Sequence, residues 1–375
     1  MKKFNVKKRL FIFIICIFLT GCWDVKDLKR LSFVSGLALD EREDKKIELI
    51  YQILLPQSSM DSNGTGVPQT IIVQSVGKNL LEAVSNVALK EDRIYSEHLK
   101  VFLIGENLAK HRNIKGLINH FIRDDEVRRS SYVILTKGKA SMAIKMPVKK
   151  KIASEKIFDI SQNEVYNGKI FTPMRLGKAS EYLQAKTSFL IQALRTNKGE
   201  IIYDGAGIID AKKQRLKGFI SPKDVQSIQW LKGETKGGVI PSKIDKKPLT
   251  YEILSLNSKV NPEIKDGQLS FNIFVKAKGK ISEDWDPHEN SFGKPYSHQV
   301  QEVIEKKMEK DMKHAMNTLQ KKYKIDPIQL GSYVHNKYPN YWRAHKKNWD
   351  EIFSQTSINY FVQVKVTNFG TKGYQ

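Results

Sequence analysis

The alternation of apolar and polar residues predicts strands at both ends of the chain. Near the N-terminus, the apolar-rich segments 31–39 and 47–55 flank a charged cluster at 40–46, a pattern typical of a β-hairpin. Near the C-terminus, apolar residues occupy alternate positions of 269–277 and of 358–366. We therefore expect each of the two C-terminal strands to bury one face.

The longest regular pattern predicts a helix from Tyr296 to Tyr323, because its apolar residues recur at helical spacing. The stripe includes Met308, Met312 and Met316, which could line an adaptable binding groove, although core packing is the more ordinary use of such residues. The two C-terminal strands are the expected packing partner of this stripe.

Between these ends the pattern predicts alternating helices and strands. The expected helices are 80–89, 114–122, 179–194 and 224–231, and the expected strands are 99–104, 131–135, 201–209 and 216–220. Segment 57–69, rich in Ser, Asn, Gly and Pro, predicts a mobile surface loop, and the lysine-rich segment 145–156 predicts a connection. Such alternation favours a sheet that is covered by helices.

The chain has 375 residues, which is too long for a single core. We expect an α+β protein of several domains with mixed sheets and packed helices, in which antiparallel C-terminal strands lie against one long amphipathic helix. After a segment 1–21 that is removed, the expected units are an N-terminal α/β region (22–195), a middle α+β region (196–250) and a C-terminal α+β domain (251–375).

The first 22 residues have the architecture of a signal peptide: a basic start, an apolar run from Leu10 to Leu19, and then Thr20, Gly21 and Cys22. Ten apolar residues rise about 15 Å as a helix, roughly half the hydrocarbon thickness of a bilayer. The ending resembles the bacterial lipobox, which implies cleavage between Gly21 and Cys22 and acylation of Cys22 with S-diacylglycerol and an N-acyl chain. A plain signal peptide cleaved elsewhere, or a short uncleaved anchor, is the alternative.

The charge balance of the chain is strongly basic, with a formal net charge of +23 at pH 7. Cleavage before Cys22 removes five positive residues and leaves +18 on the mature chain. This surplus predicts an anionic neighbour: nucleic acid, a phospholipid surface or an acidic protein. Export makes nucleic acid the least suitable of the three. The other cysteine, Cys16, lies within the apolar run, so no disulfide is expected in the mature chain.

No pattern of catalytic or ligand-binding residues emerges from the mature sequence. Its histidines lack metal-ligand spacing, and His98 and His314 are interpreted as structural or solvent-facing. The Gly205-Ala206-Gly207 segment lacks the third glycine of a nucleotide-binding loop and predicts a bulge or a close strand contact. We therefore expect no enzyme, no catalytic residues, no cofactor and no metal.

Four sequence blocks resemble one known family. Cys22-Trp23-Asp24 resembles the Cys-Trp-Asp motif that opens the mature C subunits of spore nutrient germinant receptors, the Ger(x)C lipoprotein family. Three later blocks agree with the family in order along the chain. They are Val34–Asp40, Tyr203–Gly238 and Tyr338–Phe353.

The resemblance implies a non-enzymatic, lipid-anchored subunit that works beside integral A and B subunits in nutrient-triggered germination. It implies a location on the outer face of the bacterial cytoplasmic membrane, which is the spore inner membrane. Only Cys22 receives a chemical role; Trp23 and Asp24 match the motif without an assigned role. The alternative is a lipid-anchored solute-binding protein of a transporter, which would have two doubly wound lobes and a ligand cleft.

Overall fold

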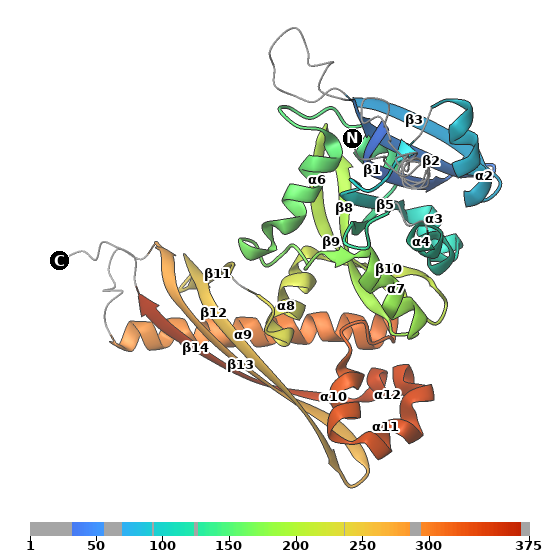
Figure 1. Ribbon diagram of the computed structural model, residues 1–375. Coiled ribbons are helices and arrows are strands. Elements are labelled where there is room, and N and C mark those ends of the chain that lie inside the picture. Colours follow the sequence, from blue (N-terminus) through green and yellow to red (C-terminus); the bar gives the residue numbers. More distant parts are fainter. Residues whose placement is uncertain are drawn as a thin grey trace, which may run out of the picture.

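Two mixed β-sheets organise the protein (Figure 1). A computed structural model describes residues 32–55, 70–91, 94–123, 127–235, 237–285 and 294–368. The first sheet has ten strands and the second has four. The predicted α+β class with mixed sheets is confirmed.

The first sheet is built from residues 32–220 and has the strand order β10-β9-β8-β6-β5-β1-β2-β3, with β4 beside β1 and β7 beside β6. Its strands are β1 (Ser32–Glu41), β2 (Ile47–Leu54), β3 (Thr70–Gly77), β4 (Ile94–Tyr95), β5 (Val101–Gly105), β6 (Tyr132–Thr136), β7 (Met174–Arg175), β8 (Phe189–Asn197), β9 (Glu200–Asp210) and β10 (Arg215–Ile220). The predicted β1–β2 hairpin is confirmed, and the strands expected at 201–209 and 216–220 pair as the β9–β10 hairpin, whereas β3 was not predicted.

Helices cover both faces of the first sheet. One face packs against α2 (Leu80–Ser85), α3 (Glu106–His111), α4 (Ile114–Arg123) and α7 (Leu176–Gln184). The opposite face packs against α5 (Ala140–Ile144) and α6 (Ala153–Ser161). Central strand β5 is buried at all five positions, as expected for a strand covered on both sides.

Two predictions in this region are wrong. The expected helix 179–194 is helical only to Gln184, and Phe189 begins β8. Phe189 through Leu194 are all buried, so this strand lacks the alternation that would identify it. The expected connection 145–156 contains the start of α6, because Ala153 and Ile157 enter the core. The predicted loop 57–69 lies outside the described residues.

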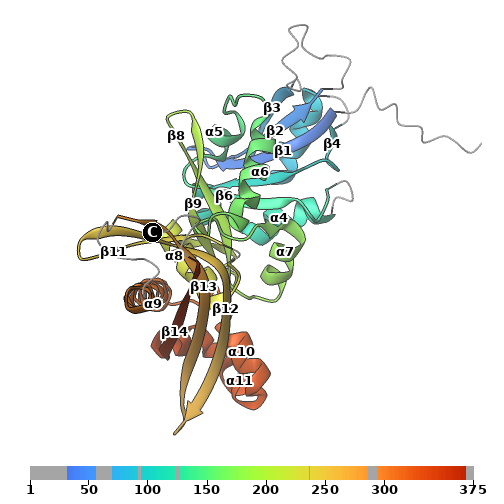
Figure 2. The same cartoon turned by 90° about the vertical axis from the view of Figure 1, so that its left-hand side faces the viewer.

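The second sheet has the strand order β11-β12-β13-β14, and its strands are β11 (Val239–Ile244), β12 (Lys247–Lys265), β13 (Gln268–Asp284) and β14 (Ser357–Asn368). Helix α9 (Lys294–Asn317), continued by a π-turn at Thr318–Tyr323, packs against this sheet and is seen end-on in Figure 2. Met308, Met312 and Met316 are buried between helix and sheet, so the core-packing interpretation of this stripe is confirmed.

The C-terminal strand pair corrects the expectation of antiparallel strands. Strands β11 to β13 are antiparallel, but β14 runs parallel to β13, with Phe361 opposite Phe274. Parallel strands need a crossover connection rather than a tight turn. Here α9, α10 (Leu330–Lys337), α11 (Pro339–His345) and α12 (Trp349–Gln355) form that crossover.

Both outer strands of the second sheet are protected. On β14, the amide of Val364 donates to Glu305 Oε1 at 2.8 Å and the amide of Val366 donates to Gln301 Oε1 at 3.0 Å. Both acceptors belong to α9. On the opposite edge, β11 carries Pro241, which has no N–H to offer, and the exposed Lys243.

Helix α8 (Pro222–Lys232) connects the two sheets. Its residues Asp224 to Leu231 are all buried, because the helix packs against β9 on one side and against β12 and α9 on the other. Strands β8 and β9 pair with each other on either side of the predicted domain boundary after residue 195. The division into three units stays a prediction. In the ranges that the structure describes, no helix is long and apolar enough to cross a bilayer.

Candidate functional site at the junction of the two sheets

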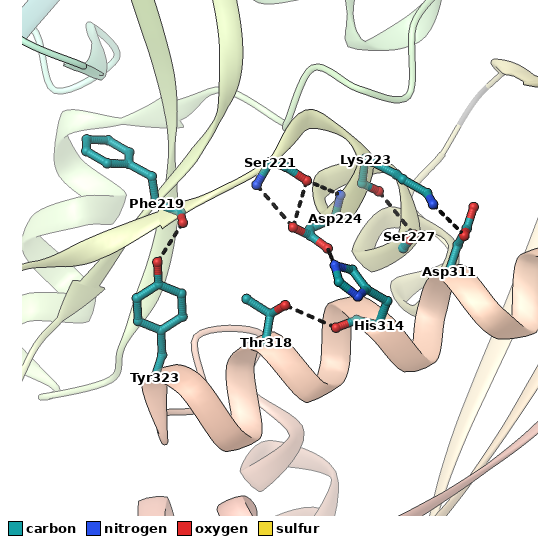
Figure 3. Close-up of polar contacts among 9 residues, drawn as sticks. All are labelled: Phe219, Ser221, Lys223, Asp224, Ser227, Asp311, His314, Thr318 and Tyr323. Atoms are coloured by element: carbon teal, nitrogen blue, oxygen red, sulfur yellow. Dashed lines mark hydrogen bonds and ion pairs between the residues drawn. The ribbon is translucent and has the colours of Figure 1, made fainter.

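The junction is the region where β10 and the start of α8 meet α9 (Figure 3). Ser221 caps α8: its Oγ accepts a hydrogen bond from the Asp224 amide at 3.1 Å. Asp224 Oδ2 in turn accepts from the Ser221 amide at 3.1 Å and from the Ser221 hydroxyl at 2.7 Å. Pro222 occupies the first turn, where its missing N–H is no loss. This capping box fixes where α8 begins.

Two buried carboxylates align α8 with α9. Asp311 on α9 lies 2.8 Å from Lys223 Nζ on α8 and 3.2 Å from Lys307 Nζ on its own helix. Asp224 on α8 points its Oδ1 toward His314 Nε2 on α9, 3.7 Å away. Each carboxylate therefore meets a cationic or imidazole group from the other helix.

A third contact joins β10 to the end of α9. The Tyr323 hydroxyl donates a hydrogen bond to the carbonyl of Phe219 at 2.7 Å. A Cβ at Gly218 would lie 2.5 Å from Tyr323 Cε1, so the tyrosine ring can approach the strand only because that position is glycine.

The glutamines of α8 extend the junction to neighbouring loops. Gln229 Nε2 donates to the carbonyls of Gly168 at 2.6 Å and Ile170 at 3.0 Å, and Gln226 Nε2 donates to Val239 at 3.2 Å. The loop before β7 and strand β11 are thus held by the same buried helix.

Two more of the family-like blocks, Val34–Asp40 and Tyr338–Phe353, also have defined structural roles. In β1, Asp40 accepts hydrogen bonds from the amides of Ala140 and Ser141, both at 2.8 Å, and so caps α5. In α12, Trp349 Nε1 donates to Asp326 Oδ2 at 2.8 Å. Both blocks therefore tie distant elements together.

The predicted lipidation and cleavage residues Gly21, Cys22, Trp23 and Asp24 lie outside the described residues. The body of the first sheet begins at Ser32. Acylation of Cys22 and cleavage before it therefore stay predictions.

Other predicted features do fall within the described ranges. Gly205 has φ +83° and lies where β9 carries one residue more than β8, so the predicted bulge is confirmed. His98 packs edge-on against Phe33, with ring centroids 5.2 Å apart. Across the described ranges, no group of three or more His, Cys, Asp or Glu side chains could hold a metal ion.

Two family descriptions match consecutive parts of the chain, with a boundary that falls where β8 meets β9. Residues 24–196 match the family described as "Spore germination protein N-terminal domain", and residues 204–370 match "Spore germination B3/GerAC like, C-terminal". The chain is also 45% identical to spore germination protein B3 of Bacillus subtilis (strain 168) over 96% of this chain and 97% of that protein. The chain belongs to the spore germination B3/GerAC-like family.

Other relatives in the family support the same assignment. Spore germination protein A3 of Bacillus subtilis (strain 168) is 34% identical over 97% of this chain and 98% of its own length. The crystal structure of the GerBC protein matches with a TM-score of 0.64 and 39% identity, covering 91% of this chain and all of that one. The predicted family and fold are thereby confirmed.

Most of the junction escaped prediction from sequence. The contacts Lys223–Asp311 and Tyr323–Phe219 join residues far apart in the chain, and no local sequence pattern predicts them. The capping box of α8 is different, because Ser221 followed three residues later by Asp224 is a local signal for a helix start.

Proposed function

We propose that this protein is a lipid-anchored, non-catalytic subunit of a spore nutrient germinant receptor, working beside integral A and B subunits. The proposal is carried by the match to spore germination protein B3 along nearly the whole chain, together with the lipobox-like ending at Cys22. In this role the protein acts as a scaffold or signalling component on the outer face of the cytoplasmic membrane.

Acylation at Cys22 would keep the folded body close to the membrane. Ten positions separate Cys22 from Ser32, where β1 begins, and a chain of this length spans at most about 35 Å when fully extended. Confinement of this kind raises the effective concentration of integral partners, so a modest interface suffices for assembly. The basic surplus of the mature chain suits a position beside anionic lipid.

The alternative of a solute-binding protein receives no specific support. Such proteins are expected to have two doubly wound lobes around a ligand cleft. The described residues instead form one ten-stranded and one four-stranded mixed sheet, and the relatives are spore germination proteins.

The decisive test replaces Cys22 with Ala in the spore-forming host. The expected result is a folded protein that leaves the detergent phase in a phase-partition assay, lacks acyl mass by mass spectrometry, and supports little nutrient-triggered germination. Cys16→Ala is the matched control, because this thiol lies in the segment that cleavage removes. Full nutrient response from an unacylated protein would contradict the proposal.

A further inference from the structure

A pocket of about 830 Å³ lies between the first sheet and the C-terminal helices. One wall comes from the end of α7, the loop that leads to β8 and the β9–β10 turn; the other comes from α10, α11 and α12. Its size falls within the range of small-molecule sites, roughly 300–1,000 Å³, and sites between structural units are common. The pocket is separate from the contacts of Figure 3.

Asp326 lines this pocket with one oxygen unsatisfied. The side chain is 95% buried, and its Oδ2 accepts hydrogen bonds from the Gly331 amide at 2.9 Å and from Trp349 Nε1 at 2.8 Å. The Leu330 amide also lies close to the carboxyl group. Within the described residues, Oδ1 is buried and has no hydrogen-bond partner. A buried polar atom of this kind is costly unless a ligand or water satisfies it.

The charge of the pocket lining is positive. Its carboxylates Glu181 and Asp350 are already paired, Glu181 with Lys178 at 2.8 Å and Asp350 with Lys212 at 2.5 Å. Three further lysines line the pocket without an ion-pair partner among the described residues. They are Lys186, Lys346 and Lys347.

The remaining wall is aromatic. Trp342 and Trp349 meet edge to face with ring centroids 5.2 Å apart, and both line the pocket. Gly331 makes room for them, since a Cβ there would lie 2.7 Å from Trp342 and 2.9 Å from Trp349. These rings offer an apolar surface to the body of a ligand.

We propose that this pocket binds a small organic carboxylate, whose charged group lies among Lys186, Lys346 and Lys347 and beside the unpartnered Oδ1 of Asp326. The apolar body of the ligand packs against Trp342 and Trp349. A phosphate group fits less well, because no arginine lines the pocket and the first amides of α10 already serve Asp326.

The direction of the Asp326 pKa favours a neutral carboxyl group that donates a hydrogen bond to the ligand. Burial raises the pKa of its carboxyl group, and the nearby Asp350 adds to that rise, whereas hydrogen bonds from Gly331, Trp349 and Leu330 oppose it. His335 and four lysines also line this region, and the positive charge of the lysines favours a bound anion over a cation. The lysines are Lys186, Lys212, Lys346 and Lys347.

Such a ligand would bridge the first sheet and the C-terminal helices. The inference goes beyond the proposed receptor role and does not depend on acylation, so it is tested on the unlipidated mature chain. Failure of lipidation and failure of ligand binding are then separate results.

The test uses benzoate as the probe, with saturation-transfer difference NMR and thermal unfolding as readouts. Benzoate should bind saturably and raise the Tm at pH 5.5, while benzylamine, benzyl alcohol and inorganic phosphate should not. Asp326→Asn should retain binding, because its amide N–H can donate from the position of Oδ1, whereas Asp326→Ala should lose it. If the alanine variant does not fold, the asparagine variant still tests the donor, because its affinity for benzoate should not change with pH where that of the wild type does.

The lysines and the proton are tested separately. Replacing Lys186, Lys346 and Lys347 together with Gln should weaken benzoate binding at least about tenfold. The same change at Lys306, Lys310 and Lys313, on the exposed face of α9, is the control and should have no effect. Wild-type affinity should fall about tenfold per pH unit above the Asp326 pKa, and Asp326→Asn should remove this dependence.

Several results would overturn the proposal. These are the absence of saturable benzoate binding to the wild type, benzylamine binding that Asp326→Asn abolishes, phosphate binding in place of benzoate, and an unchanged affinity in the triple-lysine variant.

Discussion

Tyr323 donates a 2.7 Å hydrogen bond to the carbonyl of Phe219, a residue 104 positions earlier in the chain. The contact joins the last strand of the first sheet to the π-turn that ends α9. Helix α9 also packs against the second sheet. Movement of one sheet relative to the other would therefore strain or break the hydrogen bond between Tyr323 and Phe219. The junction is therefore the place where the packing of the two sheets can be tested by mutation.

The fit between Gly218 and Tyr323 predicts a strongly non-additive pair. Gly218→Ala should destabilise the protein by about 1–3 kcal/mol, because the new methyl group would collide with the Tyr323 ring. Tyr323→Phe should cost only about 0.5–1.5 kcal/mol through loss of one hydrogen bond. Urea unfolding of the mature chain measures both. In a Tyr323→Ala background, Gly218→Ala should cost less, and an equal cost in both backgrounds would show that the ring is not the obstacle.

The capping box of α8 predicts a measurable stability effect at Ser221. Ser221→Ala removes the acceptor for the Asp224 amide and should lower the free energy of unfolding by about 0.5–2 kcal/mol. Ser85→Ala is the matched control, since Ser85 precedes a short helical turn without a side-chain cap. Equal effects of the two substitutions in chemical denaturation would argue against the cap.

Asp40 should be more important for stability than its position at the end of a strand suggests. Asp40→Ala leaves the buried amides of Ala140 and Ser141 without their acceptor, at an expected cost of about 1–3 kcal/mol. Asp44→Ala, in the exposed turn that follows, should change stability by less than about 0.5 kcal/mol. Hydrogen exchange of α5 should accelerate only in the Asp40 variant.

Glu41 predicts a pH-dependent contribution to stability. Burial opposes ionisation of this carboxyl group, but the hydrogen bond from His111 and the charge of Lys45 outweigh it and lower the pKa below the usual 4.5. A lowered folded-state pKa stabilises the folded protein fully above the usual pKa, and this stabilisation disappears as the pH falls through the lower value. Glu41→Gln should therefore be destabilising at pH 6 and nearly neutral at pH 3.

The control for this pH dependence is Glu43→Gln, an exposed position in the same turn. Its effect on unfolding should be small at both pH values. If the cost of Glu41→Gln grew as the pH fell, the lowered pKa of Glu41 would be contradicted.

Local sequence patterns identify β13, β14 and α9, whereas a bulge in β12 and Pro241 in β11 obscure the other two strands of the second sheet. Strands β13 and β14 alternate over most of their length and α9 keeps one helical stripe, so all three were predicted. Strand β12 was missed because it carries one extra residue, Leu254, between Ile253 and Ser255. Leu249, Tyr251 and Ile253 face the core, but the next buried position is Leu256, so the alternation changes phase midway.

Tertiary contacts limited the prediction of sites more than of elements. Cys22 was singled out because a lipobox is a contiguous motif, and the Ser221–Asp224 cap is visible in four residues. Asp326 and Trp349 are 23 positions apart and meet only after α10 to α12 fold together. No periodic pattern in the sequence indicates this hydrogen bond between Asp326 and Trp349, so the pocket beside them could be found only from the structure.

The protection of β14 by Glu305 and Gln301 has a consequence for crowded surfaces. If many copies of the chain are held side by side in one plane, an unprotected edge strand could pair with the edge strand of a neighbouring copy. The side-chain oxygens of Glu305 and Gln301 already accept hydrogen bonds from two amides on the β14 edge. On the β11 edge, Pro241 has no N–H that could pair with another strand. Dense packing on a membrane is thus compatible with each copy keeping its own strands, without growth into fibres.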